Sequence, residues 1–226
     1  PHGELVSTLQ DTCSGDRVAV AFSGGVDSAA ALELLPDPIP IYTQVATPKG
    51  LHQIDNALLA VEEVGGMAIR SNYDDLFPVY GKRPGFFGNG GFTVTGVLLA
   101  DFLNLKVIAD GNILEFAYLD QGIRYKRRDH TSVLLAFEAA GLRYCMPNAG
   151  LTEVWTTRIA RKYRYAMGCM RGVGGEPCRS CFKCYRKFAL KGQPIASNPE
   201  TEQRLGRELV PMLHALLWAR DRYGLA

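Results

Sequence analysis

Residues 23–28 have the sequence Ser-Gly-Gly-Val-Asp-Ser, which combines a flexible backbone with two hydroxyl groups and one carboxylate. Two glycines allow a tight turn that brings backbone N–H groups close to an oxyanion, and the N-terminus of a following helix favours negative charge. The serines add donors, and the aspartate either caps the helix or positions Mg²⁺ at bound phosphates. We therefore predict a phosphate-binding loop whose members are Ser23, Gly24, Gly25, Val26, Asp27 and Ser28, with Asp27 and Ser28 as the catalytic pair.

The alternative for this hexapeptide is an ordinary turn that uses glycine and caps a helix with serine. That interpretation would be preferred for an isolated Gly-Gly pair. The full hexapeptide between an apolar strand and an Ala-rich helix favours phosphate binding instead. It is not a Walker-type loop, because the Gly-Lys-Ser/Thr ending is missing.

Four cysteines lie within sixteen positions, with the spacing Cys-x8-Cys-x2-Cys-x2-Cys: Cys169, Cys178, Cys181 and Cys184. Short x2 spacings let sulfur atoms converge on one tetrahedral ion, and four thiolates are typical of structural zinc. A 4Fe–4S cluster is the chemical alternative, since Cys-x2-Cys-x2-Cys also occurs in ferredoxin-like sequences. Zinc is favoured because no proline follows the last cysteine and basic residues surround the cluster.

Short apolar segments alternate with helix-forming segments in the first half of the chain. We predict strands over 17–22, 39–45, 67–71 and 106–110, and helices over 27–35, 54–64 and 94–103. This alternation indicates an α/β fold with a doubly wound parallel sheet, in which ligands bind beyond the carboxyl ends of the strands. Asp110 lies at such an end and is either a nucleotide contact or a turn residue.

The second half is more helical, with helices predicted over 131–140, 152–162 and 201–223. We therefore divide the chain into a nucleotide-binding core (1–117) and a helical, zinc-binding region packed on it (118–226). Residues 74–91 are rich in Pro, Gly and aromatic residues and predict a long substrate loop or lid. The apolar stripe of 201–223 is either a homodimer face or a surface packed on its own domain.

The composition is that of an ordinary globular protein. Of 226 residues, 47% are hydrophobic and 21% charged, which excludes a disordered chain. A net charge of +2 does not favour nucleic acid as a partner, and no apolar stretch is long enough for a membrane span. The clustered cysteines favour a metal site in a reducing compartment, so we expect a cytoplasmic protein.

The hexapeptide resembles the signature of the PP-loop ATP pyrophosphatases, which include asparagine, GMP and NAD synthetases and tRNA-thiolating enzymes. The resemblance implies an adenine nucleotide alpha hydrolase-like fold, with ATP and Mg²⁺ as cofactors. It further implies that an acceptor oxygen attacks the α-phosphorus of ATP. Pyrophosphate then leaves, and a nitrogen or sulfur nucleophile displaces AMP.

The order of loop and cysteine cluster resembles the 7-cyano-7-deazaguanine synthase family of queuosine biosynthesis. That resemblance implies an AMP-forming C–N ligase, which adenylates 7-carboxy-7-deazaguanine or a related small-molecule or protein carboxylate. Ammonia then gives an amide, and a second ATP gives a nitrile. Residues 111–120 and 85–92 depart from the family's pattern where substrate should bind, so the ATP chemistry carries over more directly than the acceptor.

Two other functions remain open. One is a PP-loop sulfur transferase or tRNA-modifying enzyme, in which the cysteines hold an iron–sulfur cluster. The other is a catalytically idle binding subunit stabilised by zinc, against which the intact hexapeptide argues.

Overall fold

Five parallel strands form the central sheet, in the order β3-β2-β1-β4-β7. A computed structural model of the chain describes residues 15–45, 54–72, 91–115, 119–120, 124–125, 131–167, 169, 171–206 and 210–224. The strands are β1 (Arg17–Ala21), β2 (Ile39–Val45), β3 (Met67–Ser71), β4 (Leu105–Asp110), β7 (Arg143–Cys145) and a separate antiparallel pair, β5 (Leu119–Asp120) and β6 (Arg124–Tyr125).

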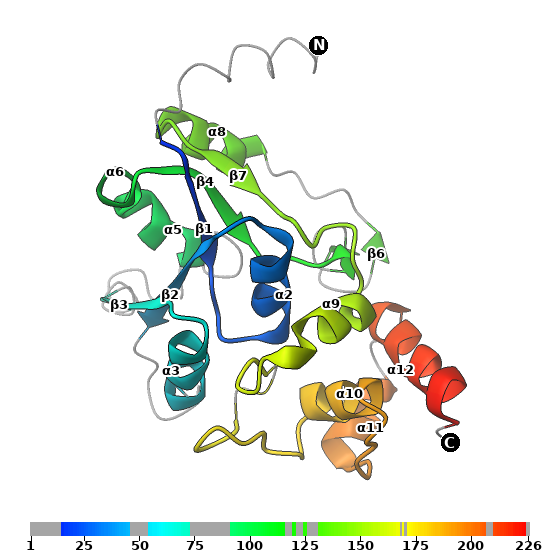
Figure 1. Cartoon of the computed structure of the whole chain (residues 1–226). Coiled ribbons are helices and arrows are strands. Elements are labelled where there is room, and N and C mark those ends of the chain that lie inside the picture. Colours follow the sequence, from blue (N-terminus) through cyan, green and yellow to red (C-terminus); the bar gives the residue numbers. More distant parts are fainter. Residues whose placement is uncertain are drawn as a thin grey trace.

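Helices cover both faces of this sheet and continue into a C-terminal helical group (Figure 1). They are α2 (Val26–Leu34), α3 (Ile54–Glu63), α5 (Gly91–Leu98), α6 (Ala100–Leu103), α8 (Thr131–Ala139), α9 (Glu153–Ile159), the 3-10 helix η4 (Ala160–Lys162), α10 (Phe182–Leu190), α11 (Pro199–Leu205) and α12 (Val210–Tyr223). The doubly wound α/β fold predicted from the sequence is thus confirmed. No helix in the described ranges is long and apolar enough to cross a membrane.

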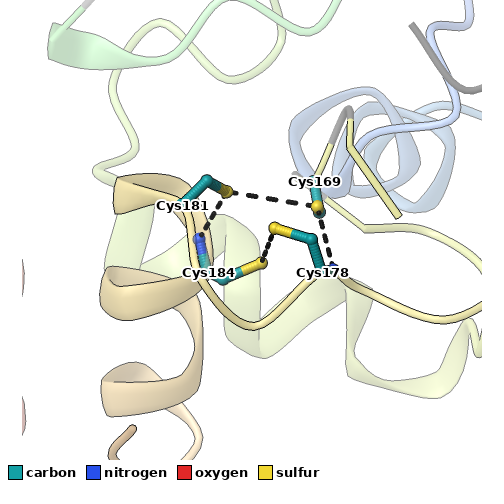
Figure 2. Close-up of side chains that lie close together, drawn as sticks. All are labelled: Cys169, Cys178, Cys181 and Cys184. Carbon is teal, nitrogen blue, oxygen red and sulfur yellow. Dashed lines mark hydrogen bonds between the residues drawn. The ribbon is translucent and has the colours of Figure 1, made fainter. Parts of the chain in front are cut away.

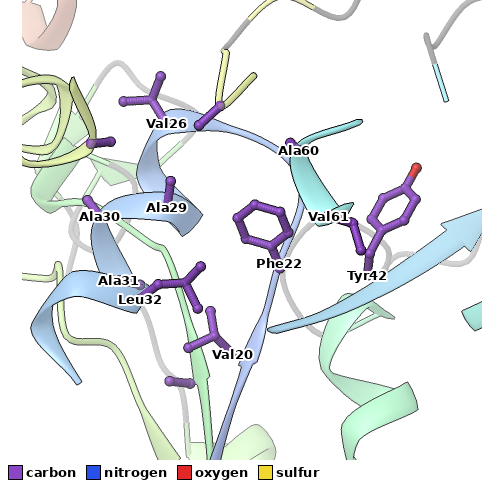
Figure 3. Close-up of a cluster of buried hydrophobic side chains, with 13 residues drawn as sticks. Val20, Phe22, Val26, Ala29, Ala30, Ala31, Leu32, Tyr42, Ala60 and Val61 are labelled. Atoms are coloured by element: carbon purple, nitrogen blue, oxygen red, sulfur yellow. The ribbon is translucent and has the colours of Figure 1, made fainter. Parts of the chain in front are cut away.

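Side chains alternate between the two faces of β1 because successive residues of a strand point in opposite directions. Val20 and Phe22 pack on α2 and α3, where the alanines of α2 let that helix lie close to the sheet (Figure 3). Ala19 faces the other side, where residues of α6 and α8 such as Leu103 and Phe137 complete a second core. Burial on both faces explains why residues 18–22, in and just after β1, are continuously apolar.

The strand order reverses direction between β1 and β4. From β1 the chain moves to β2 and β3 on one side, and then returns to β4 and β7 on the other. The two strands pair in parallel, with a register shift between Arg17 and Val18 and with Ala21 opposite Asp110 at their carboxyl ends. A doubly wound sheet binds its ligands in the crevice at such a switch point, which is where residues 23–28 follow β1.

The C-terminal helices pack on the core through α9, which contacts α2 on one side and α10 and α12 on the other. Val154 of α9 joins Ala189, Leu190, Ala215 and Ala219 in a small apolar cluster.

Two predicted helices differ in the structure, and one strand was not predicted. The prediction of one long helix over 201–223 was wrong, because α11 ends at the cap Gly206 and α12 begins at Val210. Pro211 explains the break, because proline fits a helix's first turn but not its interior. The helix over 94–103 is two helices that meet at Leu99, and β7 was missed.

Because β7 pairs with β4, the sheet takes strands from both sides of the division predicted at residue 117. That division itself stays a prediction. The predicted loop over 74–91 lies almost wholly outside the described residues.

Candidate phosphate and metal sites

The hexapeptide forms the turn between β1 and α2, as predicted. Gly24 has φ +72°, a left-handed conformation that other residues adopt at a cost, and Gly25 precedes the helix in an extended conformation. The Ser28 hydroxyl closes the turn: it donates to the Gly25 carbonyl (3.0 Å) and accepts from Ser23 N (3.1 Å). No side chain caps α2 at Gly25. The N–H groups of its first turn are therefore directed at the space where an anion would sit.

Two neighbouring segments touch the turn so closely that glycine is required. A Cβ on Gly24 would lie 2.8 Å from Ala57 Cα of α3. A Cβ on Gly111, which follows β4, would lie 2.7 Å from Ser28 N and 2.8 Å from Asp27 C. The backbone after β4 thus supports the first turn of α2 directly, and any side chain at Gly111 would displace it.

Asn148 holds the same region from the end of β7. Its side chain is fully buried, and its Nδ2 donates to the Asp27 carbonyl (2.6 Å) and to the Gly111 carbonyl (3.3 Å). One amide therefore links the residues that follow β1, β4 and β7. Sequence analysis missed Asn148, because nothing local distinguishes it from a polar residue in a loop.

The Asp27 carboxylate points toward α9 and α10. Its Oδ1 accepts from Thr156 Oγ1 (2.6 Å) and lies 3.7 Å from Lys187 Nζ, while two fifths of the side chain stays exposed. A half-exposed carboxylate beside a phosphate loop is the kind of ligand that Mg²⁺ takes together with substrate phosphates.

A buried group of charges lies behind Asp27. Glu153 accepts from Arg186 Nε (3.0 Å) and lies 3.1 Å from Lys187 Nζ, which also bonds Thr157 (3.1 Å). Burial alone raises the pKa of the Glu153 carboxyl, but the nearby Lys187 and Arg186 outweigh it and lower that pKa from 4.5 to about 2. The two ion pairs connect α10 to α9.

The four cysteines predicted as metal ligands come together before and within the first turn of α10 (Figure 2). Their sulfur atoms all lie within 4.8 Å of one another, with 3.8 Å from Cys178 to Cys184 and 4.0 Å from Cys181 to Cys169. None of the four is in a disulfide. Metal–sulfur bonds of about 2.3 Å in a tetrahedron place sulfur atoms about 3.8 Å apart, so the donor set fits a single ion.

Backbone N–H groups surround these sulfurs. Cys169 Sγ accepts from Arg171 N (3.4 Å) and Cys178 N (3.3 Å), and Cys181 Sγ accepts from Cys184 N (3.4 Å). Such bonds stabilise thiolates and hold them in place, which is the usual outer shell of a structural metal site.

Asp110 lies at the carboxyl end of β4, beside the loop after β1 as expected. Its carboxylate accepts from Asn112 N (2.9 Å), Asn112 Nδ2 (2.6 Å) and the Tyr144 hydroxyl. Burial and the adjacent Asp110 charge raise the pKa of Tyr144, so this hydroxyl remains a donor. The bonds to Asn112 fit the turn interpretation, and a nucleotide contact stays a prediction.

A family of unknown function, DUF6395, matches residues 132–211, which include the four cysteines, Asn148 and Lys187. No curated protein matches the sequence. Among solved structures, NMN synthetase from Francisella tularensis is similar, with a TM-score of 0.43 and 13% identity over 99% of this chain and 94% of that one.

Proposed function

We propose that the chain is an AMP-forming, ATP-dependent enzyme of the PP-loop type that activates a carboxylate. The observation that carries this proposal is the placement of Ser-Gly-Gly-Val-Asp-Ser at the switch point of a doubly wound sheet. There the uncapped N-terminus of α2 offers its N–H groups to an anion.

The residues of the turn would bind the β- and γ-phosphates of ATP. An oxygen of the acceptor carboxylate attacks the α-phosphorus, and an O–P bond forms while the bond to the α,β-bridging oxygen breaks. Pyrophosphate leaves with that electron pair. The helix N-terminus and the Ser23 hydroxyl stabilise the charge that develops on pyrophosphate, which speeds departure, while the Ser28 hydroxyl holds the turn closed.

The resulting acyl adenylate reacts with a nitrogen nucleophile, for which we propose ammonia. The nitrogen lone pair forms a bond to the acyl carbon, AMP leaves with the electrons of the C–O bond, and one proton is lost to give an amide. In a second round the amide oxygen attacks the α-phosphorus of another ATP, and pyrophosphate leaves with the electrons of the broken O–P bond. The amide nitrogen then loses two protons and AMP leaves with the electrons of the C–O bond, which gives a nitrile.

Two metals fit the residues present. Cys169, Cys178, Cys181 and Cys184 would hold zinc, which supplies a structural cross-link before α10. Asp27 would hold Mg²⁺ together with the phosphates, and the charge of that ion offsets the charge of pyrophosphate.

Fewer observations support the two alternative functions, a sulfur transferase with an iron–sulfur cluster and an idle binding subunit. A 4Fe–4S cluster places each thiolate on a different iron and so spreads the sulfur atoms apart, whereas these sulfurs are spaced for one ion. An idle binding subunit would not need a turn so closely supported by Ala57 and Gly111. A cytoplasmic location and a homodimer remain predictions from the sequence.

The proposal is tested by incubating the zinc-loaded protein with ATP, Mg²⁺, ammonia and 7-carboxy-7-deazaguanine, and following nucleotides and base by mass spectrometry. We expect AMP, pyrophosphate and the nitrile, and no turnover in an Asp27→Ala/Ser28→Ala control. AMP without change to the base keeps the class of enzyme and moves the search to other carboxylates. ADP plus phosphate would contradict the proposal.

A further inference from the structure

Two tryptophans and an arginine form an exposed stack where α9 meets α12 (Figure 1). The Arg158 guanidinium lies 5.1 Å from the centre of the Trp155 ring and 5.9 Å from that of Trp218. Trp155 nevertheless remains 52% exposed, although a tryptophan ring has a large apolar area to bury. Tyr223 contacts Trp218 edge-on and is 42% exposed, so it extends the aromatic surface.

Further arginines make this surface basic. Arg161 follows Arg158 by three positions, and Arg222 lies in the last turn of α12. Both are exposed, and no ion pair joins either of them to another described residue. The single acidic residue of α12 is Asp221, whose charge is balanced by Arg220 at 3.0 Å. The surface therefore carries unbalanced positive charge, which attracts an acidic partner.

An apolar cavity of about 170 Å³ lies beside the same helix, between α10 and α12. Leu217 lines it, is 43% exposed and precedes Trp218 directly, so α12 carries both the aromatic stack and the cavity. The volume exceeds that of a water molecule in the liquid, about 30 Å³, and suits one apolar side chain. Apart from Tyr185 and Arg220, the lining is aliphatic: Ala189, Pro194, Ile195, Leu216, Leu217 and Ala219.

The combination of these features favours a protein as the partner. Trp, Tyr and Arg are enriched in protein–protein interfaces and dominate their binding energy. Basic and aromatic side chains alone would also suit single-stranded RNA, whose bases stack on such rings. The aliphatic cavity does not, because a base inserted there would leave most of its polar edge without hydrogen bonds. A second copy of the chain is disfavoured as well, since a two-fold interface would bring two basic surfaces together.

We propose that α9 and α12 form a docking surface for an acidic segment of another protein. Arg158, Arg161 and Arg222 contact carboxylates of that segment, Trp155 packs on its chain, and the cavity beside Leu217 holds an apolar anchor side chain. None of these residues lies in the phosphate turn, so the proposal does not depend on the ATP chemistry.

The test selects binders from a phage-displayed library of random peptides on the zinc-loaded full chain. The most enriched peptide is labelled with fluorescein and titrated by fluorescence anisotropy into the wild type and two variants, Arg158→Glu/Arg222→Glu and Leu217→Ser. The matched controls are Arg17→Glu/Arg70→Glu and Leu98→Ser, which change exposed arginines and an exposed leucine on β1, β3 and α5. Thermal melting establishes that each variant is folded.

We expect the enriched peptides to combine Asp or Glu with Leu, Ile or Phe. The labelled peptide should bind about tenfold more weakly to each surface variant and within about twofold of wild type to the controls. No enrichment, enriched peptides without acidic residues, or equal affinity for all folded variants would overturn the proposal. So would poly(U) RNA that binds through Arg158 and Arg222, or a dimer that dissociates on Leu217→Ser, if no peptide binds.

Discussion

Lys187 Nζ lies 3.7 Å from Asp27 Oδ1, and Cys184 lies one helical turn before Lys187 on α10. A single lysine thereby connects the helix that carries the cysteines to the carboxylate of the phosphate loop. Glu153 Oε1 lies 3.1 Å from the same Nζ, and both side chains are buried. The cysteine cluster and the loop after β1 are therefore connected through one side chain.

Replacing Lys187 by glutamine tests this connection. We expect the variant to bind α,β-methylene-ATP about tenfold more weakly, because Asp27 loses the charge that orients it, while one metal ion per chain is retained. Calorimetry and metal analysis measure the two effects. Lys162→Gln, which breaks the exposed pair with Glu33, is the control and should change neither. Unchanged nucleotide affinity in the Lys187 variant would argue against the connection.

Metal removal should destabilise the C-terminal region and weaken nucleotide binding together. We expect one zinc per chain, and a Tm lowered by about 10 °C or more after chelation, because a structural site contributes its binding energy to folding. Cys184→Ser should lose the metal, whereas Cys145→Ser, whose cysteine lies outside the cluster, should keep it. A protein with no metal and an unaltered Tm after chelation would contradict the assignment.

Gly111→Ala tests whether the backbone after β4 supports the phosphate loop. The added Cβ would meet Ser28 N at 2.7 Å, so α2 or β4 must shift, and we expect affinity for the ATP analogue to fall about tenfold or more. Gly150→Ala is the matched control, because no atom lies within 4 Å of its Cβ position. Equal affinities in the two variants would show that the contact is not needed.

The buried charges around Glu153 predict a particular pH dependence. The pKa of Glu153 is lowered to about 2 in the folded chain, so its contribution to stability is complete above about pH 4.5 and is lost as pH falls toward 2. Glu153→Gln should therefore lower the free energy of unfolding by roughly 3 kcal/mol near neutral pH and by progressively less in acid. Urea unfolding at several pH values measures this difference. Glu62→Gln, on the exposed side of α3, should show little loss at any pH.

The parts of the site that sequence could predict are the local ones. The apolar strand, glycine pair and Ala-rich helix are contiguous, so their pattern predicted the turn and its placement. The cysteine spacing likewise predicted a cluster that the structure confirms as a group able to hold a metal ion. The roles of Asp27 and Ser28 in catalysis stay predictions.

The supporting contacts could not be predicted, because they join residues far apart in the chain. Asn148 and Thr156 bond Asp27 across 121 and 129 positions. Strand β7 contains only Arg-Tyr-Cys, too short for a periodic pattern, and its place in the sheet depends on β4. Because β7 was not predicted, Asn148, which follows this strand, was not recognised as lying at the end of a strand.

The central claim is that the turn after β1 binds the pyrophosphate part of ATP, and calorimetry tests this without knowledge of the acceptor. Magnesium pyrophosphate and ATP are titrated into the wild-type protein and into Ser28→Ala. We predict that pyrophosphate binds one-to-one, competes with ATP, and binds about tenfold more weakly in the variant, because the hydroxyl that closes the turn is lost. Pyrophosphate that fails to bind the wild type, or binds both proteins equally, would contradict the account.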